Sequence, residues 1–126
     1  MTWQYDHTHY KCSDPDKTAA FFKDNFGAKE VSRHQSGDMP ILTMDIGGLW
    51  FNFSPLRAGE SLNTGPGVRY GVYHMAFKTN DLEADAAKLK ARGVKFTVDV
   101  KQGGPGVKMA FVEGPDGISI ELLQRG

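Results

Sequence analysis

The chain has 126 residues, a length that fits one domain with a modest hydrophobic core. Hydrophobic residues make up 40% and charged residues 24%, and 15 basic residues balance 15 acidic ones, so the formal net charge is zero. No basic tract and no apolar run of about 18 residues occurs, which argues against nucleic-acid binding and against a membrane span. One cysteine, Cys12, and no signal-peptide pattern at the N-terminus lead us to expect a cytoplasmic protein.

Two segments of similar sequence indicate an internal repeat. His7 opens the segment His-Thr-His-Tyr-Lys-Cys-Ser-Asp, and His74 opens the segment His-Met-Ala-Phe-Lys-Thr-Asn-Asp. In both segments a lysine follows the histidine after four residues and an aspartate follows after seven. Both are β-prone, and a helical pattern comes directly after each of them.

The two predicted helices have matching start and stop signals. Asp14 is a good N-cap, Pro15 suits the first helical position, and Gly27 supplies the C-terminal stop. In the second half Asp81 is the cap and Gly93 ends the helix. Apolar residues recur at helical spacing in both: Ala19, Phe22 and Phe26 in the first helix, and Leu82, Ala86 and Leu89 in the second.

Three strand-like runs follow each helix. They cover Lys29–His34, Pro40–Ile46 and Leu49–Ser54 in the first half, and Lys95–Val100, Val107–Val112 and Ile118–Leu123 in the second. Gly47-Gly48 and Pro115-Asp116-Gly117 predict turns between the last two runs of each set. We therefore predict an α+β fold in which two tandem βαβββ modules form a curved eight-stranded mixed sheet with the helices on its outer face. Module one spans about 3–54, a linker 55–71 and module two about 72–124.

The repeat also places four polar side chains at equivalent positions. Side chains alternate faces along a strand, so His7, Asn52, His74 and Glu121 should share the concave face if the helices cover the other one. Two imidazoles and a carboxylate suit a first-row divalent metal, and a cation would be the partner that an ionised Glu121 needs on an apolar strand. The alternative is that one of the histidines is an ordinary core or surface residue.

Several segments of the chain are similar to a known family: Asp6-His7, Ser13-Asp14-Pro15, His74-Met75-Ala76-Phe77, Asn80-Asp81-Leu82, and the closing run from Phe111 to Leu122. From about Tyr5 to Leu123 the chain resembles the vicinal oxygen chelate superfamily. That superfamily includes glyoxalase I, methylmalonyl-CoA epimerase, extradiol dioxygenases and bleomycin-resistance proteins. The fold hosts many chemistries, so the resemblance specifies the superfamily more closely than the activity.

The resemblance assigns His7, His74 and Glu121 to the metal positions of the family. The fourth position falls on Asn52, where the family usually has Glu, Gln or His. Asparagine can bind a metal through its carbonyl oxygen, but it cannot accept a proton as glutamate does. His9 shares a strand face with His7, and it would bind the metal in place of Asn52, act as a base, or only line the pocket. The catalytic residues implied are Glu121, as ligand and proton shuttle, and His9.

The function implied is that of a metal-dependent lyase or isomerase of the glyoxalase type. Such an enzyme chelates vicinal oxygens of a small-molecule substrate on Zn, Ni, Co, Mn or Fe and stabilises an enolate-type intermediate. Trp3, Tyr5 and Trp50 would line the substrate cup, or pack as core residues. The alternatives are a non-haem Fe(II) dioxygenase and a non-catalytic drug-binding protein of the bleomycin-resistance type. We expect a homodimer, with each metal site formed within one chain or shared by module exchange.

Overall fold

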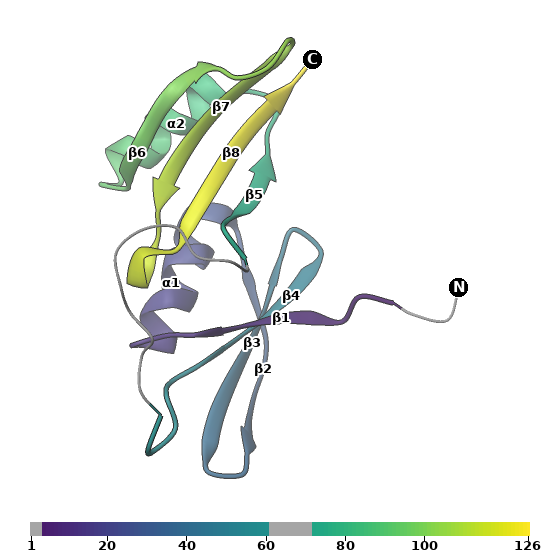
Figure 1. Ribbon diagram of the computed structural model, residues 1–126, viewed down its shortest axis with the longest axis vertical. Coiled ribbons are helices and arrows are strands. Elements are labelled where there is room, and N and C mark those ends of the chain that lie inside the picture. The colour runs from purple at the N-terminus through teal and green to yellow at the C-terminus, as the bar shows by residue number, and fades with distance from the viewer. Residues whose placement is uncertain (1–3, 61–71) are drawn as a thin grey trace. The chain divides into compact units, whose positions relative to one another are not determined.

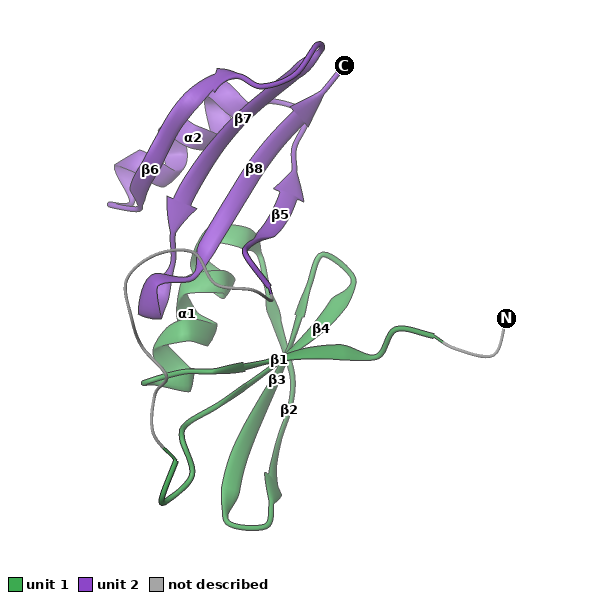
Figure 2. Ribbon diagram, in the orientation of Figure 1, with its two compact units in different colours: residues 1–64 green, residues 65–126 purple. Residues whose placement is uncertain are grey.

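The computed structural model describes residues 4–60 and 72–126, which form two compact units. Unit 1 comprises residues 1–64 and unit 2 comprises residues 65–126 (Figure 2). Trp3 and most of the predicted linker lie outside the described residues. Neither helix of the described chain is long and apolar enough to cross a membrane.

Unit 1 is a four-stranded sheet with one helix packed on it (Figure 1). Its elements are β1 (His7–Lys11), α1 (Pro15–Phe26), β2 (Lys29–Ser36), β3 (Met39–Ile46) and β4 (Leu49–Ser54). The strand order is β1-β4-β3-β2, with β1 parallel to β4 and the other two pairs antiparallel. The first strand and the last strand of the module therefore lie next to each other.

Unit 2 repeats this arrangement. Its elements are β5 (Met75–Lys78), α2 (Leu82–Ala91), β6 (Lys95–Gln102), β7 (Val107–Glu113), a short 3-10 turn η1 (Pro115–Gly117) and β8 (Ser119–Arg125). The strand order is β5-β8-β7-β6, with β5 parallel to β8. The predicted α+β class and the two βαβββ modules are confirmed. The eight strands are hydrogen-bonded as two sheets of four.

The two sheets have the same internal register. Thr8 pairs with Phe51 in unit 1, and Met75 pairs with Ile120 in unit 2. These two pairs become equivalent when His7 is matched to His74 and Asn52 to Glu121. The repeat seen in the sequence is therefore also a repeat of strand pairing.

One face of each sheet packs on its helix, and the other face carries the predicted site residues. Phe22 of α1 stacks on Phe53 of β4 at 5.8 Å between ring centroids, and both side chains are fully buried. Because side chains alternate along β4, Trp50, Asn52 and Ser54 project from the opposite face. We call this the helix-free face, and use the same term in unit 2 for the face that carries Glu121.

The six strands that follow the helices begin and end within two residues of their predicted bounds. The predicted first module begins near residue 3, whereas β1 begins at His7 and leaves Tyr5 outside the strand. The partner strand explains this difference. β4 begins at Leu49, after the Gly47-Gly48 turn, and His7 already pairs with Trp50, so residues before His7 have almost no neighbouring strand to pair with.

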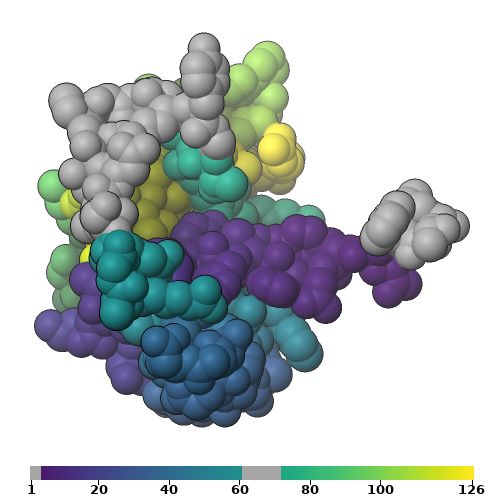
Figure 3. Space-filling model, turned by 60° about the horizontal axis from the view of Figure 1, so that its bottom comes forward, coloured from purple at the N-terminus to yellow at the C-terminus, as the bar shows by residue number. Residues whose placement is uncertain are grey.

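The β2 strand lies at the edge of the unit 1 sheet and is exposed at all eight positions. Figure 3 shows the β2–β3 hairpin, in blue, at the surface of the molecule. His34 belongs to this strand, apart from the predicted site residues on β1 and β4. It provides a histidine that can be replaced as a control.

Helix α1 begins as predicted, because the Asp14 side chain accepts a hydrogen bond from the Lys17 backbone N–H at 3.2 Å. We expect Asp14→Ala to lower the free energy of unfolding by about 1 kcal/mol, the usual value of an N-cap. Chemical denaturation measures this change. Asp24→Ala is the matched control, because Asp24 is an exposed acid near the C-terminal end of the same helix, where a negative charge opposes the helix dipole. An equal loss in both variants would contradict the capping role.

Candidate metal and substrate site

His74 and Glu121 lie together on the helix-free face of unit 2. His74 directly precedes β5, and its Nε2 atom is 3.4 Å from Oε1 of Glu121 on β8. The side chains are 25% and 18% exposed, so a carboxylate without a nearby cation would be costly there. Two atoms bound to one first-row metal by bonds of about 2.1 Å at a tetrahedral angle lie about 3.4 Å apart. The pair therefore has the spacing of two ligands of one metal ion.

Two aromatic rings fix the orientation of the His74 imidazole. Phe111 of β7 and Tyr73 both pack edge-on against it, at 5.2 and 4.9 Å between ring centroids. The Nδ1 atom is buried and has no hydrogen-bond partner among the described residues. Nε2 is therefore the ring nitrogen that faces a polar group, and that group is Glu121.

His7 on β1 has the environment that metal-binding histidines commonly have. Its Nδ1 atom lies 2.7 Å from Oδ2 of Asp6. A histidine that donates Nδ1–H to a carboxylate keeps the lone pair of Nε2 for a metal. The contact is exposed, with 38% of the His7 side chain and 82% of the Asp6 side chain accessible, so it contributes little to stability.

Asn52 on β4 has its carbonyl oxygen already engaged. Thr43 of β3 donates its hydroxyl hydrogen to Oδ1 of Asn52 at 2.6 Å. The two residues are paired across β3 and β4, and Thr43 is buried. An amide oxygen held in this way is a poorer metal ligand than a free one. Thr43 was not singled out from the sequence, because a lone threonine on a predicted strand gives no functional signal.

His9 on β1 contacts Ser54 on β4, with 2.7 Å between Nε2 and the serine Oγ. Ser54 is fully buried, whereas His9 is exposed. Burial of part of the ring lowers the pKa of His9 below its ordinary value, and electrostatic interactions with Lys11, His7 and Arg57 lower it further. These effects favour the neutral form of the His9 ring.

The lowered pKa of His9 leads to a prediction for the titration of its ring and for the pH dependence of stability. An NMR titration of the ring proton resonances should give a pKa below 6.5, and Lys11→Met should raise that pKa. The folded chain then binds fewer protons than the unfolded chain. The contribution of His9 to the free energy of unfolding is complete above pH 6.5 and is lost as the pH falls through the folded pKa. A measured pKa at or above 6.5 would contradict the combined effect of burial and the neighbouring charges on the ring.

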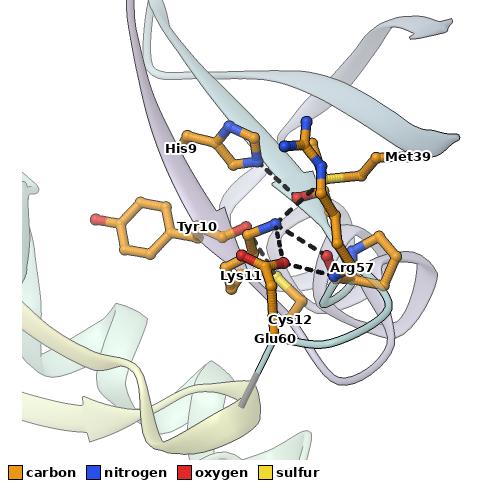
Figure 4. A network of polar contacts seen from close by, with 9 residues as sticks. His9, Tyr10, Lys11, Cys12, Met39, Arg57 and Glu60 are labelled. Carbon is orange, nitrogen blue, oxygen red and sulfur yellow. Dashed lines mark hydrogen bonds and ion pairs between the residues drawn. The ribbon is translucent and has the colours of Figure 1, made fainter. Parts of the chain in front are cut away.

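Lys11 anchors the start of the predicted linker to β1. Its Nζ atom donates to Sδ of Met39 at 3.1 Å, to the carbonyl oxygen of Pro55 at 3.2 Å and to Oε1 of Glu60 at 3.2 Å (Figure 4). The backbone N–H of Arg57 donates to the same carboxylate. The three Lys11 contacts join residues that are 28, 44 and 49 positions apart, so no local pattern in the sequence could have predicted them.

An open cavity of about 370 Å³ lies between the start of α1 and strands β2 and β3. Its lining includes the core residues Leu42 and Phe53, and the ion pair of Arg33 with Asp16 at 2.7 Å belongs to it. None of the predicted site residues lines this cavity. It is separate from the helix-free face.

The structure brings the predicted residues together in two groups. Unit 2 holds His74 and Glu121, and unit 1 holds His7, His9 and Asn52. Within the described part of either unit, no three His, Cys, Asp or Glu side chains gather in a possible metal cluster. The two aromatic candidates that can be described are exposed: Tyr5 by 64% and Trp50, opposite His7, by 43%.

Residues 4–122 match the model of the Glyoxalase/Bleomycin resistance protein/Dioxygenase superfamily. A putative lactoylglutathione lyase from Brassica oleracea var. gemmifera is 30% identical over 128 residues, which cover 95% of this chain and 44% of that protein. The lactoylglutathione lyase GLX1 of Arabidopsis thaliana has the same identity and coverage, 30% and 44%. The chain thus spans less than half the length of these curated relatives.

Solved structures share the fold at lower identity. A mutant of the fosfomycin resistance protein FosX from Listeria monocytogenes, complexed with Mn(II) and 1S,2S-dihydroxypropylphosphonic acid, has a TM-score of 0.77 at 22% identity. That match covers 100% of this chain and 95% of the FosX chain. Such likeness at 22% identity establishes the fold alone.

Proposed function

Because the chain belongs to the Glyoxalase/Bleomycin resistance protein/Dioxygenase superfamily, we propose that it is a metal-dependent lyase or isomerase of the glyoxalase type. The observation that carries the proposal is the pair of His74 and Glu121, half-buried side chains whose facing atoms lie 3.4 Å apart. The lactoylglutathione lyases among its relatives support the class of reaction, although the chain spans less than half of their length.

The proposed ligands are His74, Glu121 and His7. The first two have the spacing that one metal ion requires, and the third rests on its matching position in the repeat and on its contact with Asp6. His7 would come from the same chain or from a second copy in a homodimer. Asn52 is the weakest of the predicted ligands, because its carbonyl oxygen accepts the Thr43 hydroxyl.

The chemistry proposed for the site depends on a polarised carbonyl. A divalent cation supplies that polarisation when bound, and it makes an adjacent C–H proton more acidic. Glu121, the carboxylate next to His74, is the group proposed to accept this proton and return it. His9 and Asn52 are polar groups on the helix-free face of unit 1, and Trp50 and Tyr5 provide apolar surface.

A metal-loaded activity screen tests this function. The purified chain is loaded in turn with Ni, Co, Mn, Fe and Zn and assayed with the adduct of methylglyoxal and glutathione. We expect turnover that requires the metal, that is lost in Glu121→Gln, and that persists in the control His34→Gln. Oxygen uptake with a catechol after iron loading would instead indicate a dioxygenase. Tight binding of a ligand without turnover would indicate a binding protein.

A further inference from the structure

Two buried hydroxyl groups hold two polar side chains on the helix-free face of unit 1. Ser54 is fully buried and lies 2.7 Å from Nε2 of His9. Thr43 is 4% exposed and lies 2.6 Å from Oδ1 of Asn52. His9 and Asn52 are direct partners in the register of β1 and β4. The two contacts therefore act on neighbouring side chains.

The need of each buried hydroxyl for an acceptor fixes the roles in both contacts. A hydroxyl hydrogen buried without an acceptor costs about 1–3 kcal/mol, so nearly all of them are paired. In the described chain His9 is the hydrogen-bond partner of the Ser54 side chain, and Asn52 is that of Thr43. Each hydroxyl must then donate, and Nε2 of His9 and Oδ1 of Asn52 must accept.

The consequence is that Nε2 of His9 and Oδ1 of Asn52 are both already engaged in hydrogen bonds. With Nε2 accepting, the ring proton of His9 is on Nδ1, and Figure 4 shows this second nitrogen pointing away from the serine contact. Oδ1 of Asn52 already accepts one hydrogen bond from Thr43, whereas both N–H donors of its amide remain available. His9 and Asn52 thus offer mainly hydrogen-bond donors to a ligand.

The other half of the repeat lacks this arrangement. The strand registers match His9 to Ala76, Thr43 to Phe111 and Ser54 to Leu123. The same three positions are apolar in unit 2, so the fold itself does not require polar groups there. Burying two hydroxyls in unit 1 needs another reason, and the reason we consider is recognition of a ligand.

We propose that Ser54 and Thr43 are positioning residues that make His9 and Asn52 hydrogen-bond donors toward the substrate. The helix-free face of unit 1 then recognises electron-rich oxygens, those of a carbonyl or a carboxylate group. This inference rests on the proposed function, which supplies the substrate. It adds which chemical group of the substrate is bound and which atoms of the protein bind it. It also assigns His9 the role of donor and not that of base.

The tautomer of His9 tests the proposal. Long-range proton–nitrogen NMR spectra of the metal-free ¹⁵N-labelled chain distinguish Nδ1–H from Nε2–H, and loss of signals in His9→Asn identifies the ring. We expect Nδ1–H in the wild type. Ser54→Ala should return His9 to the Nε2–H form that free imidazole side chains favour in water, and Ser54→Thr should restore Nδ1–H. A purely structural role of Ser54 would not produce this pattern.

Kinetics of the metal-loaded enzyme with the methylglyoxal–glutathione adduct give the second readout. Ser54→Ala and Thr43→Val should each lower kcat/KM about tenfold, the effect of one misplaced hydrogen bond, and Ser54→Thr and Thr43→Ser should recover most of it. Metal affinity should stay unchanged in all four variants. The proposal is overturned by Nε2–H in the wild-type ring, or by a tautomer that Ser54→Ala leaves unaltered. A wild type that neither binds metal nor turns over would refute the proposed function, while the tautomer would still decide this inference.

Discussion

Replacing His74 by alanine should weaken the binding of a divalent metal by more than about 100-fold, because loss of a direct ligand costs more than the 10–100-fold typical of a supporting residue. His74 Nε2 and Glu121 Oε1 form the pair with metal-ligand spacing, and the described chain offers His74 no other polar partner at this nitrogen. Titration calorimetry with Ni, Co, Mn or Zn measures the affinity of wild type and variant. The folded state of the variant is checked by circular dichroism.

His34→Ala is the matched control for this experiment. His34 is exposed on β2 of unit 1, so its loss removes an imidazole without touching the pair in unit 2. We expect its metal affinity to equal that of the wild type. Equal affinities in wild type, His34→Ala and His74→Ala would mean that any bound metal sits elsewhere on the chain.

Replacing Phe53 by alanine should lower the free energy of unfolding of unit 1 by about 3–5 kcal/mol, the range found when a buried phenylalanine is truncated. Phe53 is fully buried, stacks on Phe22 of α1 and contacts Tyr10 of β1 at 6.3 Å between ring centroids. A loss of this size is a large fraction of the stability of a small unit. Chemical denaturation followed by the fluorescence of Trp50, on the same strand, measures it.

Leu49→Ala separates a core effect from a general sensitivity of β4. Leu49 begins the strand and is 52% exposed, so truncation there should change the free energy of unfolding by less than about 0.5 kcal/mol. The stacking of α1 on β4 would be contradicted if the two variants lost equal stability.

The repeat explains why much of the fold could be predicted. Asp14 and Asp81 cap their helices, and Gly47-Gly48 adopts the positive φ angles, 62° and 91°, that a tight hairpin turn requires. These are local signals, and each is visible within a few residues of sequence. Alternation along β8 likewise placed Glu121 opposite the buried Ile120 and Leu122, where the structure has it.

The groups that support the site could not be predicted, because they depend on strand register and on distant loops. Ser54 reaches His9 across 45 positions, and Lys11 reaches Glu60 across 49. A serine at the end of a strand and an acid in a linker look ordinary in the sequence. The strand registers bring Thr43 next to Asn52, and this contact changes the fourth predicted ligand from a free amide oxygen to one that is already bonded.

Anomalous diffraction from crystals grown with Mn²⁺ tests the proposed metal site, because it locates the metal without reference to activity. We predict one strong peak per chain, at about 2.0–2.2 Å from both Nε2 of His74 and a carboxylate oxygen of Glu121. Nε2 of His7, from either copy, should lie at the same distance, and Oδ1 of Asn52 should remain bonded to Thr43. A peak away from His74 and Glu121, or no peak at a saturating concentration of the metal, would contradict the proposed site.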